Sequence, residues 1–313
     1  MIRDLYRYVW KVSSRNQILL SLLAVVLFLL ELVPLELQRR IVNDAVAQRE
    51  FQSIALLCLA YLMAVVVQGG TKLVLNVFRG SVSESANQRL RSEANLLAMA
   101  SAPDRGAAED EGAAISIIVS EVEAVGGFVG TSFSELLLNG GMLLSIFGYM
   151  LYVEPWLALV AILLFCPQVI FVPIVQRAIN RRTKRRIETL RALGTQIVDD
   201  ASDSKATRRK TYLRQVGEVY ALNMQILRRK FGMNFLMNLL HHFGIVGLLF
   251  VGGWQFLHGK TEMGTVVAFI SGLSRMNDPW GDLVNFFRDL SNTAVKYRMI
   301  TSALEKKGAA APA

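Results

Sequence analysis

Three charged residues stand close together in the otherwise apolar segment 264–287, namely Arg275, Asp278 and Asp282. Their i, i+3 and i+7 spacing places them on one face of a helix. Charges within an apolar segment are costly, so they normally face a polar cavity or a partner. Two interpretations follow. Either the three residues line a cavity, where they contact or gate a bound molecule, or they pair with one another in an inner vestibule.

Glu31 and Glu135 are the other acidic candidates within apolar stretches. Glu31 interrupts the apolar run 25–33 and precedes Pro34 by three residues. A carrier driven by protons needs carboxylates of this kind that meet both sides of a membrane in turn. The alternative is that Glu31 reaches toward the membrane surface or bonds to a neighbouring helix.

No motif in the sequence points to catalysis or metal binding. Cys58 and Cys166 have no second cysteine or histidine at a metal-binding spacing. The nearest match to a phosphate-binding loop, within 253–261, has five residues between its glycines where the motif requires four. His241 and His242 fit packing better than metal ligation. We expect no catalytic residue, no metal site and no cofactor in this chain, which is predicted not to be an enzyme.

The composition of the chain indicates the class of protein that carries these residues. The chain has 313 residues, of which 53% are hydrophobic and 19% charged, whereas soluble proteins carry about 25% charge. The formal net charge of +9 could suggest nucleic acid. Basic residues beside apolar runs are more simply explained as signals of membrane topology. We therefore predict an integral membrane protein in a lipid bilayer, with no nucleic-acid partner.

Six segments are long enough to cross a hydrocarbon core, which takes roughly 20 apolar residues. They cover residues 17–37, 54–77, 128–152, 156–175, 235–257 and 264–287. The predicted fold is all-α and polytopic, with six transmembrane helices. Residues 1–16 form an N-terminal segment, 17–304 one transmembrane domain and 305–313 a disordered tail.

The connections between these spans are unequal in length. Only 78–127 and 176–234 are long, and both emerge on the same side of the membrane. Most of the 34 Lys+Arg lie on that side, so the positive-inside rule places both termini and both long connections in the cytoplasm. Their composition predicts that the spans continue into water as helices, giving two helical hairpins with turns near 101–106 and 212–217.

This arrangement resembles the transmembrane domain of type I ABC exporters over residues 16–304. Pro34 followed by 41–44 (Ile-Val-Asn-Asp) is similar to that family's Pro…Ile-x-x-Asp element. The glycines within 252–264, then Val266-Val267-Ala268-Phe269 and Pro279, are similar to the glycine-rich run of its last two spans.

The resemblance extends to the two hairpins. Gly112, Ile115 and Glu121 match a coupling segment of the family, although its Arg is absent and Glu121 replaces an Asp. Lys210-Thr211-Tyr212 matches the Lys-Ala-(Phe/Tyr) element, without the glycine that usually precedes it. The resemblance implies that the hairpin tips dock into an ATPase. The residues expected to contact that ATPase are Gly112, Ile115, Glu121, Lys210, Tyr212 and Glu218.

The resemblance further implies a permease subunit of an exporter that works by alternating access. The chain ends at Ala313 with no nucleotide-binding domain, so we expect a separately encoded ATPase subunit that holds ATP and Mg. The other expected partner is a second copy, giving a homodimer, or a related six-span half. The expected location is a bacterial-type inner (plasma) membrane, with Arg275, Asp278, Asp282, Glu31 and Glu135 in the cavity or its gate.

Two alternatives remain open. One is a proton-driven transporter on an ABC-like scaffold without a nucleotide domain. The other is a membrane interaction or regulatory subunit that transports nothing. The altered coupling positions, with their missing Arg and Gly, favour these alternatives, whereas the retained ones favour an ATPase partner.

Overall fold

The computed structural model describes residues 2–100, 122–198 and 205–308, and every regular element among them is a helix. This confirms the predicted all-α fold. Five of the described helices are long and apolar enough to cross a membrane. The chain divides into two compact units, Met1–Pro155 with Gly252–Ala313, and Trp156–Val251.

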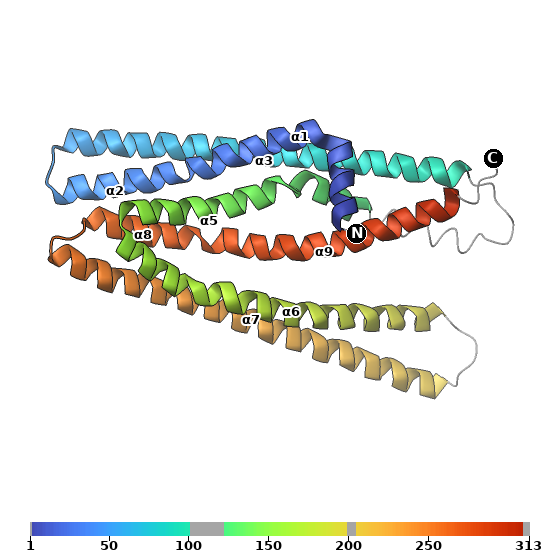
Figure 1. The fold of residues 1–313 in the computed structure, drawn as a ribbon. Helices are drawn as coiled ribbons and strands as arrows, with labels where there is room; N and C mark the ends of the chain where they lie inside the picture. The colour runs from blue at the N-terminus through green and yellow to red at the C-terminus, as the bar shows by residue number, and fades with distance from the viewer. Residues whose placement is uncertain (1, 101–121, 199–204, 309–313) are drawn as a thin grey trace. The chain divides into compact units, whose positions relative to one another are not determined.

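The first unit is a bundle of long helices (Figure 1). Residues 122–131 are also helical and precede α5. The helices of this unit are α1 (Ile2–Leu30), α2 (Leu32–Val46), α3 (Phe51–Ala100), α5 (Ser134–Val153), α8 (Met263–Arg275) and α9 (Asn277–Gly308). α3 extends well beyond the predicted span 54–77, as expected for a span that continues into water. α9 includes residues 305–308, so this part of the predicted disordered tail is helical, and 309–313 lie outside the described residues.

Proline explains two breaks in this unit. A proline has no N–H to donate, and its ring clashes with the carbonyl group four residues earlier. Pro34 lies four residues after Leu30, where α1 ends, and Pro279 lies four residues after Arg275, where α8 ends. The predicted span 264–287 is therefore two helices, and it is not one of the five that qualify by length and composition.

A third interruption divides the predicted span 128–152. Ser132 and Phe133 form a turn between the helix 122–131 and α5. The Ser132 and Ser134 hydroxyls each donate a hydrogen bond to a backbone carbonyl three or four residues earlier, on Val129 and Gly130, at 3.3 Å. Such bonds bend helices, which is a physical reason for the turn.

The core of this unit joins the N-terminal segment to the bundle. α1 has a non-helical residue at Ser13, and Figure 1 shows the residues before it turned across the other helices. Leu5 and Val9 are fully buried there. The Tyr6 ring packs edge-on against Phe128 and Phe133, with ring centroids 5.9 and 5.2 Å apart. Aromatic contacts and apolar burial therefore fix this segment in place.

Glycine allows the closest helix contact in the unit. A Cβ atom at Gly126 would collide with Asn87, and one at Gly130 would collide with Ser83 and the backbone of Arg79. Glycine therefore permits close approach of the helices at these two positions. At Gly127, by contrast, a Cβ would meet open space.

The second unit consists of most of α6 (Pro155–Val198) and α7 (Lys205–Leu257), which run antiparallel. Gln168 Nε2 donates to the Met237 carbonyl at 3.2 Å, and Arg182 Nε donates to Gln225 Oε1 at 3.0 Å. From the first bond to the second, the residue number rises along α6 and falls along α7, as it must for antiparallel helices. This confirms the predicted helical hairpin.

The predicted position of this hairpin's turn is wrong. Residues 212–217 lie within α7, whereas α6 ends at Val198 and α7 begins at Lys205. The intervening segment 199–204 lies outside the described residues. A single Gly217 in a segment of good helix formers does not end a helix.

Candidate functional site

A cavity of about 350 Å³ lies in the first unit beside the two proline breaks. Four elements contribute to it: α1 with the residue after it, α3, α5, and the junction of α8 with α9. All five residues predicted for a cavity or gate line it, and they are Glu31, Glu135, Arg275, Asp278 and Asp282. Lys72, Asn76, Arg79 and Asn139 supply further polar groups to the wall.

An ion pair joins the two breaks across this cavity. Arg275 Nη1 donates to Glu31 Oε2 at 3.0 Å. The Glu31 side chain is only 10% exposed and that of Arg275 is 28% exposed. Arg275 is the last residue of α8, and Glu31 is the single residue between α1 and α2. Each charge is therefore presented where a helix is interrupted, and the pair links the first broken helix to the last.

Arg79 is a further basic residue of the cavity wall. Its Nε donates to Ser134 Oγ at 2.8 Å, while its buried Nη2 has no hydrogen-bond partner within the described part of the chain. Glu135 and Asp282 are close enough to act on it electrostatically. A buried guanidinium nitrogen without a partner is costly, so this group is available to a ligand or to water.

The cavity carries charges of both signs in nearly equal number. Lys72, Arg79 and Arg275 are basic, and the four acids are those predicted. The wall can thus bind a polar group of either sign, but its net charge is too small to hold an isolated ion tightly. Such a wall suits a polar or zwitterionic group that enters and leaves.

Sequence reasoning missed Arg79 and gave Lys72 no role. Lys72 lies inside the predicted span 54–77, where a lysine is already unusual. Arg79 lies two residues beyond that span and looked like an ordinary residue of the connection. The length of α3, which continues through Arg79 to Ala100 without a break, is what keeps it at the cavity wall.

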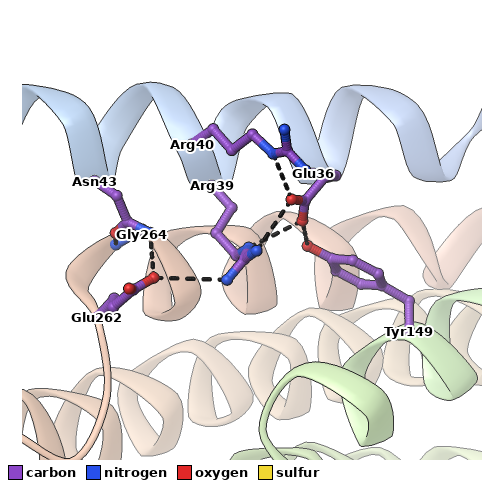
Figure 2. A network of polar contacts seen from close by, with 7 residues as sticks. All are labelled: Glu36, Arg39, Arg40, Asn43, Tyr149, Glu262 and Gly264. Carbon is purple, nitrogen blue, oxygen red and sulfur yellow. Dashed lines mark hydrogen bonds and ion pairs between the residues drawn. The ribbon is translucent and has the colours of Figure 1, made fainter.

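A second polar network lies between α2, α5 and the segment before α8 (Figure 2). Glu36 accepts hydrogen bonds from Arg39 Nε at 2.9 Å, Arg40 Nε at 2.7 Å and the Tyr149 hydroxyl at 2.9 Å. Glu36 thus gathers two arginines of α2 and a tyrosine of α5. Its four charge-assisted contacts with these groups, counting Arg39 Nη2 at 3.0 Å, make it the centre of the network.

The other half of this network fixes the start of α8. Asn43 Oδ1 accepts a hydrogen bond from the backbone N–H of Gly264 at 2.7 Å, and Asn43 Nδ2 donates to Glu262. Arg39 Nη1 lies 3.5 Å from Glu262. A Cβ atom at Gly264 would collide with the Arg39 carbonyl, so only glycine permits this approach. The Pro34…Asp44 element thus contacts Gly264, the last glycine of the glycine-rich run 252–264.

Only three of the six predicted ATPase-coupling residues lie in the described part of the chain, all on α7. Gly112, Ile115 and Glu121 lie outside the described residues. Lys210 and Tyr212 are exposed near the start of α7. Glu218 lies farther along α7 and accepts a hydrogen bond from Arg185 Nη2 of α6 at 2.9 Å. Glu218 therefore holds the two arms of the hairpin together.

Comparison with known proteins identifies the family. Residues 18–280 match the model of the ABC transporter transmembrane region. An ATP-dependent lipid A-core flippase of Desulfotalea psychrophila is 24% identical over 178 residues, an alignment that covers 54% of this chain and 31% of the flippase. The chain thus spans less than a third of that relative's length. With its several apolar helices it is a multi-pass membrane protein. The match over most of the chain shows that it belongs to the family of ABC transporter transmembrane regions.

Proposed function

We propose that this chain is the membrane-spanning permease subunit of an ABC-type exporter. The observation that carries the proposal is the charged cavity, where Glu31 and Arg275 join the two broken helices at 3.0 Å. Family membership supports a transport role, and the flippase relative supports an amphipathic, lipid-like substrate. Such a substrate would place its polar group in the cavity and its apolar part in the bilayer.

Alternating access follows from the same two breaks. A helix that lacks a backbone hydrogen bond at a proline bends more easily there than elsewhere. Because the Glu31–Arg275 pair links the breaks, bending of α1–α2 and of α8–α9 would be coupled. The Glu36–Asn43 network would fix α2 to the start of α8 in the same movement. In this proposal the two helices tilt together and open the cavity to one side of the membrane at a time.

The energy would come from a separately encoded ATPase that binds ATP and Mg. The long arms of α3, α6 and α7 would transmit its movement, and the exposed Lys210 and Tyr212 would belong to the contact. Two copies of the chain would form the transporter in a bacterial inner membrane, with both termini cytoplasmic.

The test begins with purification from native membranes in mild detergent, followed by identification of the ATPase that accompanies the chain. The complex is then reconstituted into liposomes containing a fluorescently labelled phospholipid, and its movement between leaflets is followed by dithionite quenching. We expect movement that requires ATP and is reduced at least tenfold by Arg275→Gln. Arg89→Gln, which removes an exposed arginine paired with Glu93, serves as the matched control and should leave it unchanged.

Other outcomes would replace the proposal. Movement that needs a pH gradient instead of ATP, and that Glu31→Gln abolishes, would identify a proton-driven transporter. Recovery of a specific partner that is not an ATPase, with no transport under either condition, would identify an interaction subunit.

A further inference from the structure

Six basic residues form a band around the α6–α7 hairpin, which we call the basic band. On α6 they are Arg177, Arg181 and Lys184, and on α7 they are Arg228, Arg229 and Lys230. All six are exposed. Two hydrogen bonds between the antiparallel helices, Gln168–Met237 and Arg182–Gln225, set their alignment. Arg177 lies between these bonds on α6, and Arg228 lies between them on α7. The two triplets are therefore at about the same level of the hairpin.

The band differs from the basic residues between the two helices. Arg182, Arg185 and Arg186 bond across to Gln225, Glu218 and Asn223 at 3.0, 2.9 and 3.2 Å. Within the part of the chain that the structure describes, Lys184 alone of the six band residues has an acidic neighbour, Glu188 at 4.0 Å. The band is thus basic surface that the hairpin itself does not neutralise.

Acidic residues are absent over a long stretch around the band. The sequence has no Asp or Glu in 155–187 or in 219–261, and the first acids are Glu188 and Glu218. The band thus lies between arms that carry both acidic and basic residues and a region without acids. No nearby carboxylate within this stretch cancels the positive electrostatic potential of the band. That potential extends to about a Debye length from the surface.

Exposed apolar side chains lie immediately next to the band. Ile170 and Ile174 of α6 are 66% and 60% exposed, and Phe231 and Phe235 of α7 are 62% and 68% exposed. These residues precede the band on α6 and follow it on α7, so in an antiparallel pair they lie on the same side of it. Acyl chains would cover them. The order along the hairpin is then acyl region, basic band and an arm of mixed charge, which is the order expected at a membrane surface.

We propose that the basic band binds the headgroups of anionic phospholipids in the leaflet from which the α6–α7 arms emerge. The phosphate groups contact the arginines and lysines, and the acyl chains cover the neighbouring isoleucines and phenylalanines. A soluble anion would satisfy only the charges and would leave the apolar side chains exposed to water. The favoured ligand therefore carries both parts, as phosphatidylglycerol does.

The test measures lipid binding to the purified chain in detergent by native mass spectrometry, with phosphatidylglycerol and phosphatidylcholine as probes. Each basic residue at a membrane surface strengthens anionic lipid binding roughly fivefold. Arg177→Gln/Arg228→Gln/Arg229→Gln should therefore weaken phosphatidylglycerol binding by at least about tenfold and leave phosphatidylcholine binding unchanged. The single variant Arg228→Gln should weaken it about fivefold, which covers the case in which the triple variant does not fold.

The control removes three exposed arginines outside the band, Arg91, Arg214 and Arg298. Their replacement by glutamine should change the preference for phosphatidylglycerol by less than twofold. Equal preference in the wild type and the band variants would overturn the proposal. Displacement of phosphatidylglycerol by an equal concentration of soluble glycerol phosphate would also overturn it, because the site would then recognise a free anion. The measurement needs neither ATP nor transport, so its outcome is independent of the proposed exporter function.

Discussion

Arg275→Gln removes the cation that links the two proline breaks, and its effect on stability can be worked from the structure. The variant leaves the Glu31 carboxylate, whose side chain is 10% exposed, without the partner it has at 3.0 Å. Breaking a buried pair from one side costs about 3–5 kcal/mol. Because the Arg275 side chain is 28% exposed and both groups face a cavity, we expect the lower end, about 3 kcal/mol.

The double variant Glu31→Gln/Arg275→Gln distinguishes the free energy of the ion pair from the cost of leaving one charge unpaired. Two neutral amides leave no uncompensated charge, so the double variant should lose only about 1 kcal/mol. The double variant should therefore be about 2 kcal/mol more stable than Arg275→Gln alone, and the two substitutions should not be additive, as is usual for residues in direct contact. At about 2–4 °C per kcal/mol, Arg275→Gln should lower the unfolding midpoint by at least about 6 °C.

The assay is thermal unfolding in one detergent at fixed concentration, followed by the fluorescence of the four tryptophans. Arg89→Gln is the control, because its pair with Glu93 has the same 3.0 Å separation but side chains that are 53% and 44% exposed. It should cost less than about 1 kcal/mol. If Arg275→Gln shifts the midpoint no more than Arg89→Gln does, or if the two cavity variants are additive, the argument that this pair joins the breaks is wrong.

Three further predictions concern the other contacts of the first unit. Tyr149→Phe removes a hydrogen bond to the charged Glu36 and should lower the free energy of unfolding by about 1.5 kcal/mol, which denaturation in detergent measures; an unchanged value would show that the hydroxyl is not needed. Gly130→Ala should destabilise by about 1–3 kcal/mol through its collision with α3, while Gly127→Ala, in open space, should be neutral or stabilising by the same measurement; equal effects would refute the close approach. Gly264→Ala should separate the start of α8 from α2 and speed proteolysis after Lys260, and wild-type cleavage rates would contradict that contact.

Five of the cavity's charged residues stand out in the sequence because a charge within an apolar segment is costly unless it faces a polar cavity or a partner. Glu31, Glu135, Arg275, Asp278 and Asp282 were selected on that basis alone, and all five line one cavity. Their pairing could not be predicted in the same way. The i, i+3, i+7 spacing suggested contacts among the three residues of 275–282, whereas Arg275 pairs with Glu31, 244 positions away. Such a contact depends on tertiary packing.

The helix boundaries show where hydropathy alone is insufficient. Average hydropathy treats 264–287 as one span because it does not weigh the position of a single proline. The rule that a helix stops four residues before an internal proline would have placed both breaks, at Leu30 and at Arg275. It is not sufficient by itself, since α6 continues through Pro167 and Pro173. Which prolines end a helix depends on the surroundings.

The cavity supplies those surroundings. A proline leaves the carbonyl four residues earlier without its helical hydrogen bond, and in hydrocarbon an unsatisfied carbonyl costs several kcal/mol. Glu31 and Arg275, the residues at the two breaks, line a polar cavity of about 350 Å³, which is large enough to hold water beside the broken ends. The same water and the opposite charge allow Glu31 and Arg275 to remain within the bundle. The breaks therefore need the cavity, and the ion pair holds the broken ends around it. A change that removed the charges would disfavour the breaks as well, which is why the same residues determine both the bend of these helices and what can bind between them.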